Sequence, residues 1–170
     1  MSRSLVGLLR MATSISVLTA SLLLPGSAFA AQAVGTVPGN TVPGSTGCPK
    51  HPAPVICVDL SHQRLWVQKN GKTGFPSVPI RSGRRGDATR TGWFHVFRRD
   101  EHHWSNEYSS PMPYSLFFSG GQAIHGVAED LSRGPGSHGC VNIGVADARR
   151  LWAATTLGEA VYVWGRKPGT

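Results

Sequence analysis

Short strand-like segments, with runs or alternation of apolar residues, follow one another from residue 55 to residue 164. Residues 55–60 and 64–68 are of this kind, and Asn70-Gly71 is a strong signal for a two-residue hairpin turn into residues 75–80. Further strands are expected at residues 92–97, 115–118, 122–125 and 160–164. The pattern predicts a mainly β domain.

One helix is expected to interrupt the strands. Between Asp147 and Gly158, four apolar residues recur at roughly helical spacing, namely Ala148, Leu151, Trp152 and Leu157. Gly158 is expected to end the helix. Four tryptophans, at positions 66, 93, 152 and 164, are assigned to the core in preference to a ligand-binding surface.

The first 30 residues have the features of a secretory signal peptide. They begin with Arg3 and Arg10, continue through an apolar stretch at residues 11–24 and end with small residues at Ala28 and Ala30. We expect cleavage after Ala30 and secretion or retention in the cell envelope, outside the cytoplasmic membrane. An uncleaved membrane anchor stays open as the alternative, although the stretch is shorter than the roughly 20 residues that a spanning helix needs.

Residues 31–53 are predicted to be a linker rich in Pro, Gly and Thr. Residues 31–47 contain no charged or aromatic residue and therefore have little with which to build a core. Residues 54–166 then form a single domain, because the 140 residues left after cleavage suffice for one sizeable core.

The chain is basic, with a formal charge of +8. Loss of residues 1–30 removes two arginines and leaves 15 Lys and Arg against 9 Asp and Glu, a balance of +6. Export argues against nucleic acid as the partner, whereas an anionic cell wall or membrane surface attracts such a protein. A charge that serves solubility alone stays open as the alternative.

The three cysteines leave one free thiol if one disulfide forms. Cys48 and Cys57 lie nine positions apart and are the expected pair, which fastens the start of the domain to its first strand. Cys140 is then the free thiol. A disulfide between Cys140 and either of the others stays open as the rival pairing.

Cys140 lies in the sequence Ser137-His138-Gly139-Cys140-Val141-Asn142-Ile143, and His125 lies fifteen positions upstream. A thiol becomes a useful nucleophile when a neighbouring base favours its thiolate, so Cys140 and a histidine are a candidate catalytic pair. An isolated cysteine is more often an inert buried side chain. The glycines around Cys140 indicate a loop instead of a packed element and favour catalysis.

This block, together with Ile124-His125-Gly126, resembles the signature of the L,D-transpeptidase catalytic domain, also called YkuD-type. The resemblance covers about residues 54–165, with supporting matches at residues 59–71, Ser82-Gly83, residues 89–94 and Met112-Pro113-Tyr114. Arg90 stands where the family commonly has proline, which affects local loop shape. The resemblance implies a β-sandwich with one helix after the cysteine loop.

The resemblance also implies a reaction on peptidoglycan stem peptides, without a cofactor or a metal. Cys140 attacks a donor tetrapeptide before its terminal D-Ala, D-Ala leaves, and the thioester passes to a neighbouring stem to form a 3-3 cross-link. Carbapenem-type β-lactams are then expected inhibitors, and the protein is expected to be a monomer. Water, a D-amino acid or a protein as acceptor stays open, which includes an L,D-carboxypeptidase and a protein-to-peptidoglycan transferase.

The same resemblance implies the roles of individual residues. His125 is the base, with His138 as the alternative, and it is oriented by the carbonyl of Gly126, with Glu129 or Asp130 as the alternative orienting group. The N–H groups of Gly139 and Cys140 are the oxyanion donors. Support or substrate contact is expected from a further set, namely Ser137, His138, Asn142 and Tyr114, with Tyr108 and Arg133 as weaker candidates for substrate contact.

Three other classes of protein remain as alternatives. A sortase has the same chain order of histidine and cysteine, but it places them farther apart. A zinc hydrolase would use His125, His138 and Cys140 as ligands. A cell-wall-binding module would keep the fold and lack the chemistry.

Overall fold

The computed structural model describes residues 47–170, so the expected signal peptide and residues 31–46 of the expected linker lie outside the described residues. Nine strands and one helix follow in the order β1 (Val55–Asp59), β2 (Arg64–Lys69), β3 (Lys72–Pro79), β4 (Gly92–His95), β5 (Arg98–Ser105), β6 (Ser110–Ser119), β7 (Gln122–Val127), β8 (Val141–Gly144), α1 (Val145–Ala154) and β9 (Ala160–Trp164). The mainly β prediction with one helix after the cysteine loop is confirmed.

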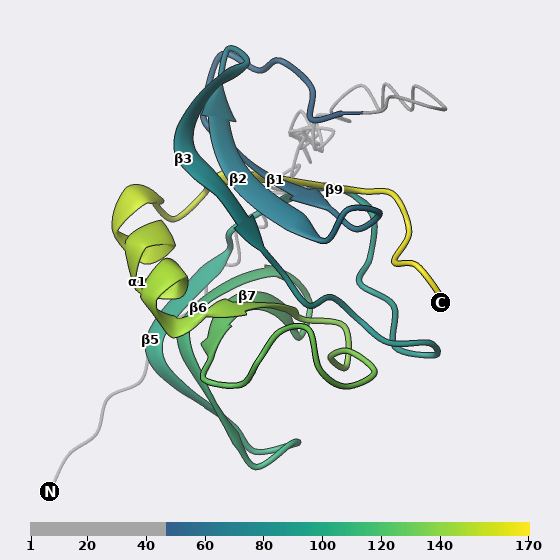
Figure 1. The fold of residues 1–170 in the computed structure, drawn as a ribbon. Coiled ribbons are helices and arrows are strands. Elements are labelled where there is room, and N and C mark those ends of the chain that lie inside the picture. The colour runs from purple at the N-terminus through teal and green to yellow at the C-terminus, as the bar shows by residue number, and fades with distance from the viewer. Residues whose placement is uncertain (1–46) are drawn as a thin grey trace, which may run out of the picture. The chain divides into compact units, whose positions relative to one another are not determined.

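The strands of residues 47–170 form two sheets, with the orders β3-β2-β1-β9-β4 and β5-β6-β7-β8. The pairs β1/β9 and β7/β8 are parallel, and the other pairs are antiparallel. Figure 1 shows β1, β2, β3 and β9 in one layer, β5, β6 and β7 in the other, and α1 beside them. Alternation along β1 directs Ile56 and Val58 into the core between the sheets, where they meet Leu116 and Ile124.

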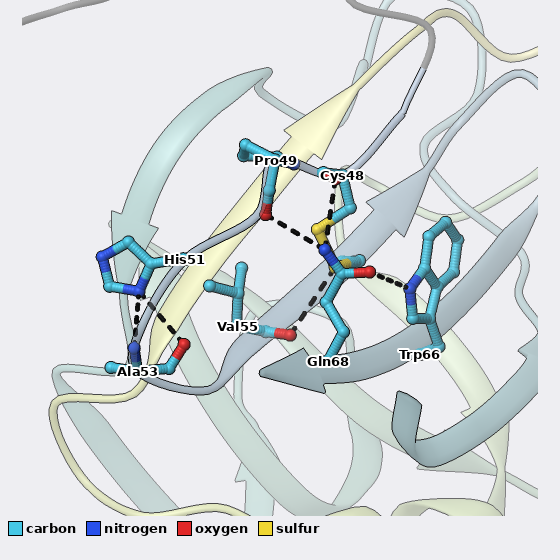
Figure 2. Close-up of a disulfide and its surroundings, with 8 residues drawn as sticks. Cys48, Pro49, His51, Ala53, Val55, Trp66 and Gln68 are labelled. Atoms are coloured by element: carbon cyan, nitrogen blue, oxygen red, sulfur yellow. Dashed lines mark hydrogen bonds between the residues drawn. A yellow bond between two sulfur atoms is a disulfide. The ribbon is translucent and has the colours of Figure 1, made fainter. Parts of the chain in front are cut away.

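The other face of β1 is also buried, because Cys48 from the preceding segment and aromatic side chains of β2 and β9 cover it. Cys57 forms a disulfide with Cys48, with the two Cα atoms 5.7 Å apart. The side-chain amide of Gln68 donates to the carbonyl oxygens of Cys48 and Pro49 at 3.1 and 3.0 Å (Figure 2). The Asn70 N–H also donates to the carbonyl oxygen of His51 at 2.8 Å, so one disulfide and three hydrogen bonds fasten the segment that precedes β1 to the sheet and its first hairpin.

The hairpin turn is confirmed at Asn70-Gly71, where both residues have the positive φ that a two-residue hairpin turn of type I′ requires. Two strands were not predicted. β5 is an edge strand rich in charged and polar residues, and β8 has only four residues, so neither gives a clear alternating pattern. The strand expected at residues 92–97 is shorter and ends at His95.

The helix ends at Ala154, before the predicted stop at Gly158. The hydroxyl of Thr155 donates to the carbonyl oxygen of Leu151 at 2.8 Å and satisfies one of the last carbonyls of the helix. Leu157 therefore lies outside the helix and is exposed. No helix in the described part of the chain has the length and apolar character needed to cross a bilayer.

The prediction that all four tryptophans are core residues is wrong, because none of them is fully buried. Trp93 is exposed, and Trp66, Trp152 and Trp164 are only half-buried. Trp66 and Trp164 pack on the outer face of the five-stranded sheet around Cys57, together with Tyr162. A two-residue period tells which side chains share a face, but it does not tell which face is covered.

Candidate active site

Parallel pairing of β7 with β8 places His125 and Asn142 opposite each other, so their side chains lie on the same face of the sheet. Cys140 lies directly before β8. All three residues line a cleft of about 280 Å³, together with Ser137 and His138. The structure therefore brings together the cysteine and both histidines of the sequence motif.

His125 is buried and held at both ring nitrogens. Nδ1 lies 3.1 Å from the carbonyl oxygen of Gly126, and Nε2 lies 2.8 Å from the amide nitrogen of Asn142. The guanidinium of Arg81 donates to the side-chain oxygen of Asn142 at 3.3 Å. Because that bond fixes the amide orientation, Asn142 donates to Nε2 and the Nδ1–H donates to Gly126.

Neither carboxylate proposed as an alternative partner contacts His125. Glu129 pairs with Arg81 at 2.7 Å, and Asp130 accepts hydrogen bonds from Ser132 and pairs with Arg133 at 3.2 Å. The orienting group of His125 in this structure is a backbone carbonyl. Arg133, a candidate for substrate contact, lies exposed in this loop and does not line the cleft.

Burial favours the neutral form of both candidate reacting groups. It lowers the pKa of His125 from 6.5 to about 4; the Gly126 carbonyl opposes this, and electrostatic interactions with His103 and Arg81 add to it. Burial also raises the pKa of the Cys140 thiol above 9.0, against the Ala123 N–H that donates to the sulfur. The resting pair is therefore a thiol and a neutral imidazole.

The cysteine turn is held by hydroxyl groups. Ser137 Oγ donates to the carbonyl oxygen of Cys140 at 2.5 Å and accepts the Gly139 N–H at 3.1 Å. Gly139 has a φ of +106°, and a Cβ at this position would collide with the side chain of Gln122. Glycine is therefore favoured at position 139 by the backbone conformation, and a larger residue would also have to displace Gln122.

The expected oxyanion donors are not equivalent in this turn. The Gly139 N–H already donates to Ser137, whereas the hydrogen bonds of the turn do not use the Cys140 N–H. The buried Thr89 hydroxyl donates to the carbonyl oxygen of Gly139 at 2.9 Å and accepts the Gly83 N–H at 2.9 Å. Because the carbonyl and the following N–H of a peptide point in opposite directions, Thr89 orients the Cys140 N–H.

The cleft entrance carries an aromatic pair. The rings of His138 and Tyr108 stack with centroids 4.2 Å apart, and both residues are exposed. This position fits the supporting role expected for His138. Tyr114, in contrast, does not line the cleft: it packs against Trp152 and the core between the sheets, with a φ of +58°. In this structure Tyr114 has a packing role, and its expected substrate contact stays a prediction.

Arg81 and Thr89 were not singled out from the sequence. Their partners, Asn142 and Gly139, are 61 and 50 positions away, and nothing in the local sequence indicates these contacts. Residues 47–170 contain no group of three or more His, Cys, Asp or Glu side chains placed to hold a metal ion.

Comparison with known proteins gives one family. Residues 53–163 match the L,D-transpeptidase catalytic domain, YkuD. No curated protein matches the chain. An L,D-transpeptidase structure from Stackebrandtia nassauensis is 35% identical, with a TM-score of 0.69, and the match covers 74% of this chain and 62% of that one.

Two further structures share the fold. An L,D-transpeptidase from Xylanimonas cellulosilytica is 24% identical, with a TM-score of 0.61 and coverage of 69% of this chain and 63% of that one. L,D-transpeptidase 3 from Mycobacterium tuberculosis, in complex with a faropenem-derived adduct, is 20% identical, with a TM-score of 0.61 and coverage of 67% and 61%. The chain thus spans about three fifths of the length of these structures.

Proposed function

The chain belongs to the family of L,D-transpeptidase catalytic domains, and on this basis we propose that it is an exported enzyme that forms 3-3 cross-links in peptidoglycan. The observation that carries the proposal is the cleft in which the free Cys140 lies with His125 and Asn142. Residues 1–30 serve as the signal peptide in this proposal, and the linker predicted at residues 31–53 ends before Cys48, because Cys48 and Pro49 are fastened to the domain. The donor is a tetrapeptide stem that ends in D-Ala.

Acylation begins when the thiol proton moves to Nε2 of His125. The lone pair of that nitrogen accepts a hydrogen bond from Asn142 in the resting state, so the thiol must replace the amide as its partner. The sulfur then attacks the carbonyl carbon of the third residue of the stem. The Cys140 N–H donates to the developing oxyanion.

The tetrahedral intermediate collapses by loss of D-Ala. The C–N bond breaks, His125 gives its proton to the leaving amine, and the acyl group stays on the sulfur as a thioester. In the second half of the reaction, which removes the acyl group from the enzyme, the side-chain amine of a neighbouring stem attacks the thioester. The amide bond forms, and the sulfur leaves and regains a proton through His125.

β-Lactams of the carbapenem type acylate the same sulfur in this proposal. The faropenem-derived adduct in the M. tuberculosis structure supports this, because that protein shares the fold. Incubation with a carbapenem is expected to add the mass of the drug to the native chain and not to Cys140→Ala. An unmodified mass of the native chain after prolonged incubation would count against the proposed nucleophile.

The deciding experiment gives a purified disaccharide-tetrapeptide to the native chain and to Cys140→Ala. A dimer that has lost one D-Ala, formed only by the native chain, is the expected product. A monomer that has merely lost D-Ala identifies a carboxypeptidase. Absence of any product with several stem peptides would contradict the transpeptidase and favour a wall-binding module.

A further inference from the structure

A second cleft, of about 700 Å³, shares no lining residue with the cleft that contains Cys140. Residues 82–91, after β3, form one wall, and residues 165–170, after β9, form the other. Figure 1 shows these two segments at the same side of the sheets. The volume is that of sites that bind a ligand of several chemical groups, well above what a single ion needs.

The charge of this cleft is strongly one-sided. Its lining contains five basic residues and no acidic one, the basic residues being Arg84, Arg85, Arg90, Arg166 and Lys167. Four of the five are arginines, whose planar guanidinium groups match carboxylate and phosphate oxygens in pairs. The cleft therefore concentrates positive charge within a small volume.

Three of these cations are already held by the protein. Arg84 pairs with Asp87 at 2.7 Å, and Arg90 donates to the carbonyl oxygen of Ser119 at 2.9 Å. The Lys167 amine donates to the carbonyl oxygens of Ser82 and Pro135 at 3.3 and 3.0 Å. Their positive ends are thus fixed before any ligand arrives, which lowers the entropy cost of binding.

The other two cations have no such partner. The side chains of Arg85 and Arg166 are exposed and form neither an ion pair nor a hydrogen bond with any residue between 47 and 170. The Asp87 carboxylate is the acidic group beside this loop, and Arg84 already binds it. Gathering like charges in this way costs folding energy, which an anionic ligand offsets.

We propose that this cleft binds a ligand that carries several oxyanion groups, either phosphates or carboxylates. The proposal goes beyond the cross-linking reaction, because it requires neither Cys140 nor a donor stem. An exported protein with such a cleft is retained on a surface made of anionic polymer. Part of the net positive charge of the chain is thus concentrated in this cleft.

The test measures binding of two probes to the chain at low ionic strength by fluorescence anisotropy. The probes are labelled poly(glycerol phosphate) and labelled poly-glutamate with equal numbers of charges, and neutral dextran is the blank. Arg85→Gln with Arg166→Gln removes two unpartnered cations from the cleft. Lys72→Gln with Arg149→Gln removes the same charge from exposed positions on β3 and α1.

We expect the cleft variant to bind about tenfold more weakly, since two charge pairs in a cleft together contribute on the order of 1.4 kcal/mol, and the control variant to stay within about twofold. If the cleft variant loses affinity for the phosphate probe alone, phosphate is the ligand group. If it loses affinity for poly-glutamate alone, the ligand group is carboxylate. Loss with both supports a site for either oxyanion.

Equal losses in the two variants would show a general charge effect and overturn the proposal, as would failure of both probes to bind. Thermal unfolding of each variant checks that the fold is kept. Because the readout is binding and not turnover, a negative result leaves the proposed transpeptidase reaction untouched.

Discussion

The side-chain amide of Asn142 lies 2.8 Å from Nε2 of His125, and the two residues are register partners on the parallel strands β7 and β8. In the proposed mechanism Nε2 takes the thiol proton, yet in this structure Nε2 accepts a hydrogen bond from Asn142. In the described part of the chain, no hydrogen bond joins His125 to Cys140, whose sulfur contacts the Ala123 N–H and the Gly121 carbonyl. The structure is therefore a resting state with a neutral imidazole.

Replacement of Asn142 by Asp places a negative charge against Nε2. A carboxylate at this distance favours the imidazolium, so we expect the pKa of His125 to rise from about 4 by about one to three pH units. NMR titration of the histidine signals measures this, with His125→Gln used to assign the signal. Asn142→Ala, which removes the amide without adding charge, is the control. If His125 titrates at the same pH in Asn142→Asp as in the native chain, the contact between residue 142 and Nε2 is contradicted.

Acid stability depends on His125. Its pKa is about 4 in the folded chain and near 6.5 when unfolded, so the unfolded state binds more protons between these values. The free energy of unfolding is therefore highest above pH 6.5. Protonation of His125 in the unfolded chain lowers it by about 3 kcal/mol as the pH falls towards 4. Urea unfolding at several pH values checks this. The free energy of unfolding of His125→Gln is expected to fall less over the same pH range. Parallel curves of this free energy against pH for the native chain and the variant would contradict the role of His125.

Alkylation of Cys140 reports the state of the thiol. Because burial raises the pKa of this thiol above its usual value, the rate with iodoacetamide is expected to rise about tenfold for each pH unit up to about pH 8, without a plateau near neutrality. Mass spectrometry of the labelled chain gives the rate, with Cys140→Ala as the blank. A plateau that begins between pH 4 and pH 7 would indicate a preformed thiolate-imidazolium pair instead.

Thr89→Val tests the orientation of the Cys140 N–H. Valine has nearly the shape of threonine but lacks the hydroxyl that binds Gly139 and Gly83, so the oxyanion donor loses its support. We expect acylation by a carbapenem to slow by about tenfold, less than for direct loss of an oxyanion donor. Stopped-flow kinetics at several drug concentrations separate this rate from binding.

Thr89→Ser keeps the hydroxyl and serves as the matched control. Valine is also expected to cost about 1 to 3 kcal/mol in stability, because two buried backbone groups lose their partner. The acylation rate is therefore measured well below the unfolding temperature. A normal rate in Thr89→Val would show that the hydroxyl acts on stability alone.

The sequence by itself determined the class of fold and the family, and it named the candidate reactive residues. The alternation at residues 55–80 and the Asn70-Gly71 turn predicted the first hairpin, because side-chain period and turn conformation are local properties. The block around Cys140 and the upstream His125 identified the family for a similar reason: a nucleophile on a glycine-flanked turn needs particular neighbours in the chain.

Only the tertiary structure decided how those residues are held. Arg81 reaches Asn142 across 61 positions, Thr89 reaches Gly139 across 50, and Tyr114 turns towards Trp152 and away from the cleft. The basic cleft also depends on the tertiary structure, because its walls come from residues 82–91 and 165–170, which are far apart in the sequence. Such contacts depend on the order of strands within a sheet and on the packing of side chains, and both arise from burial across the whole domain and not from local sequence.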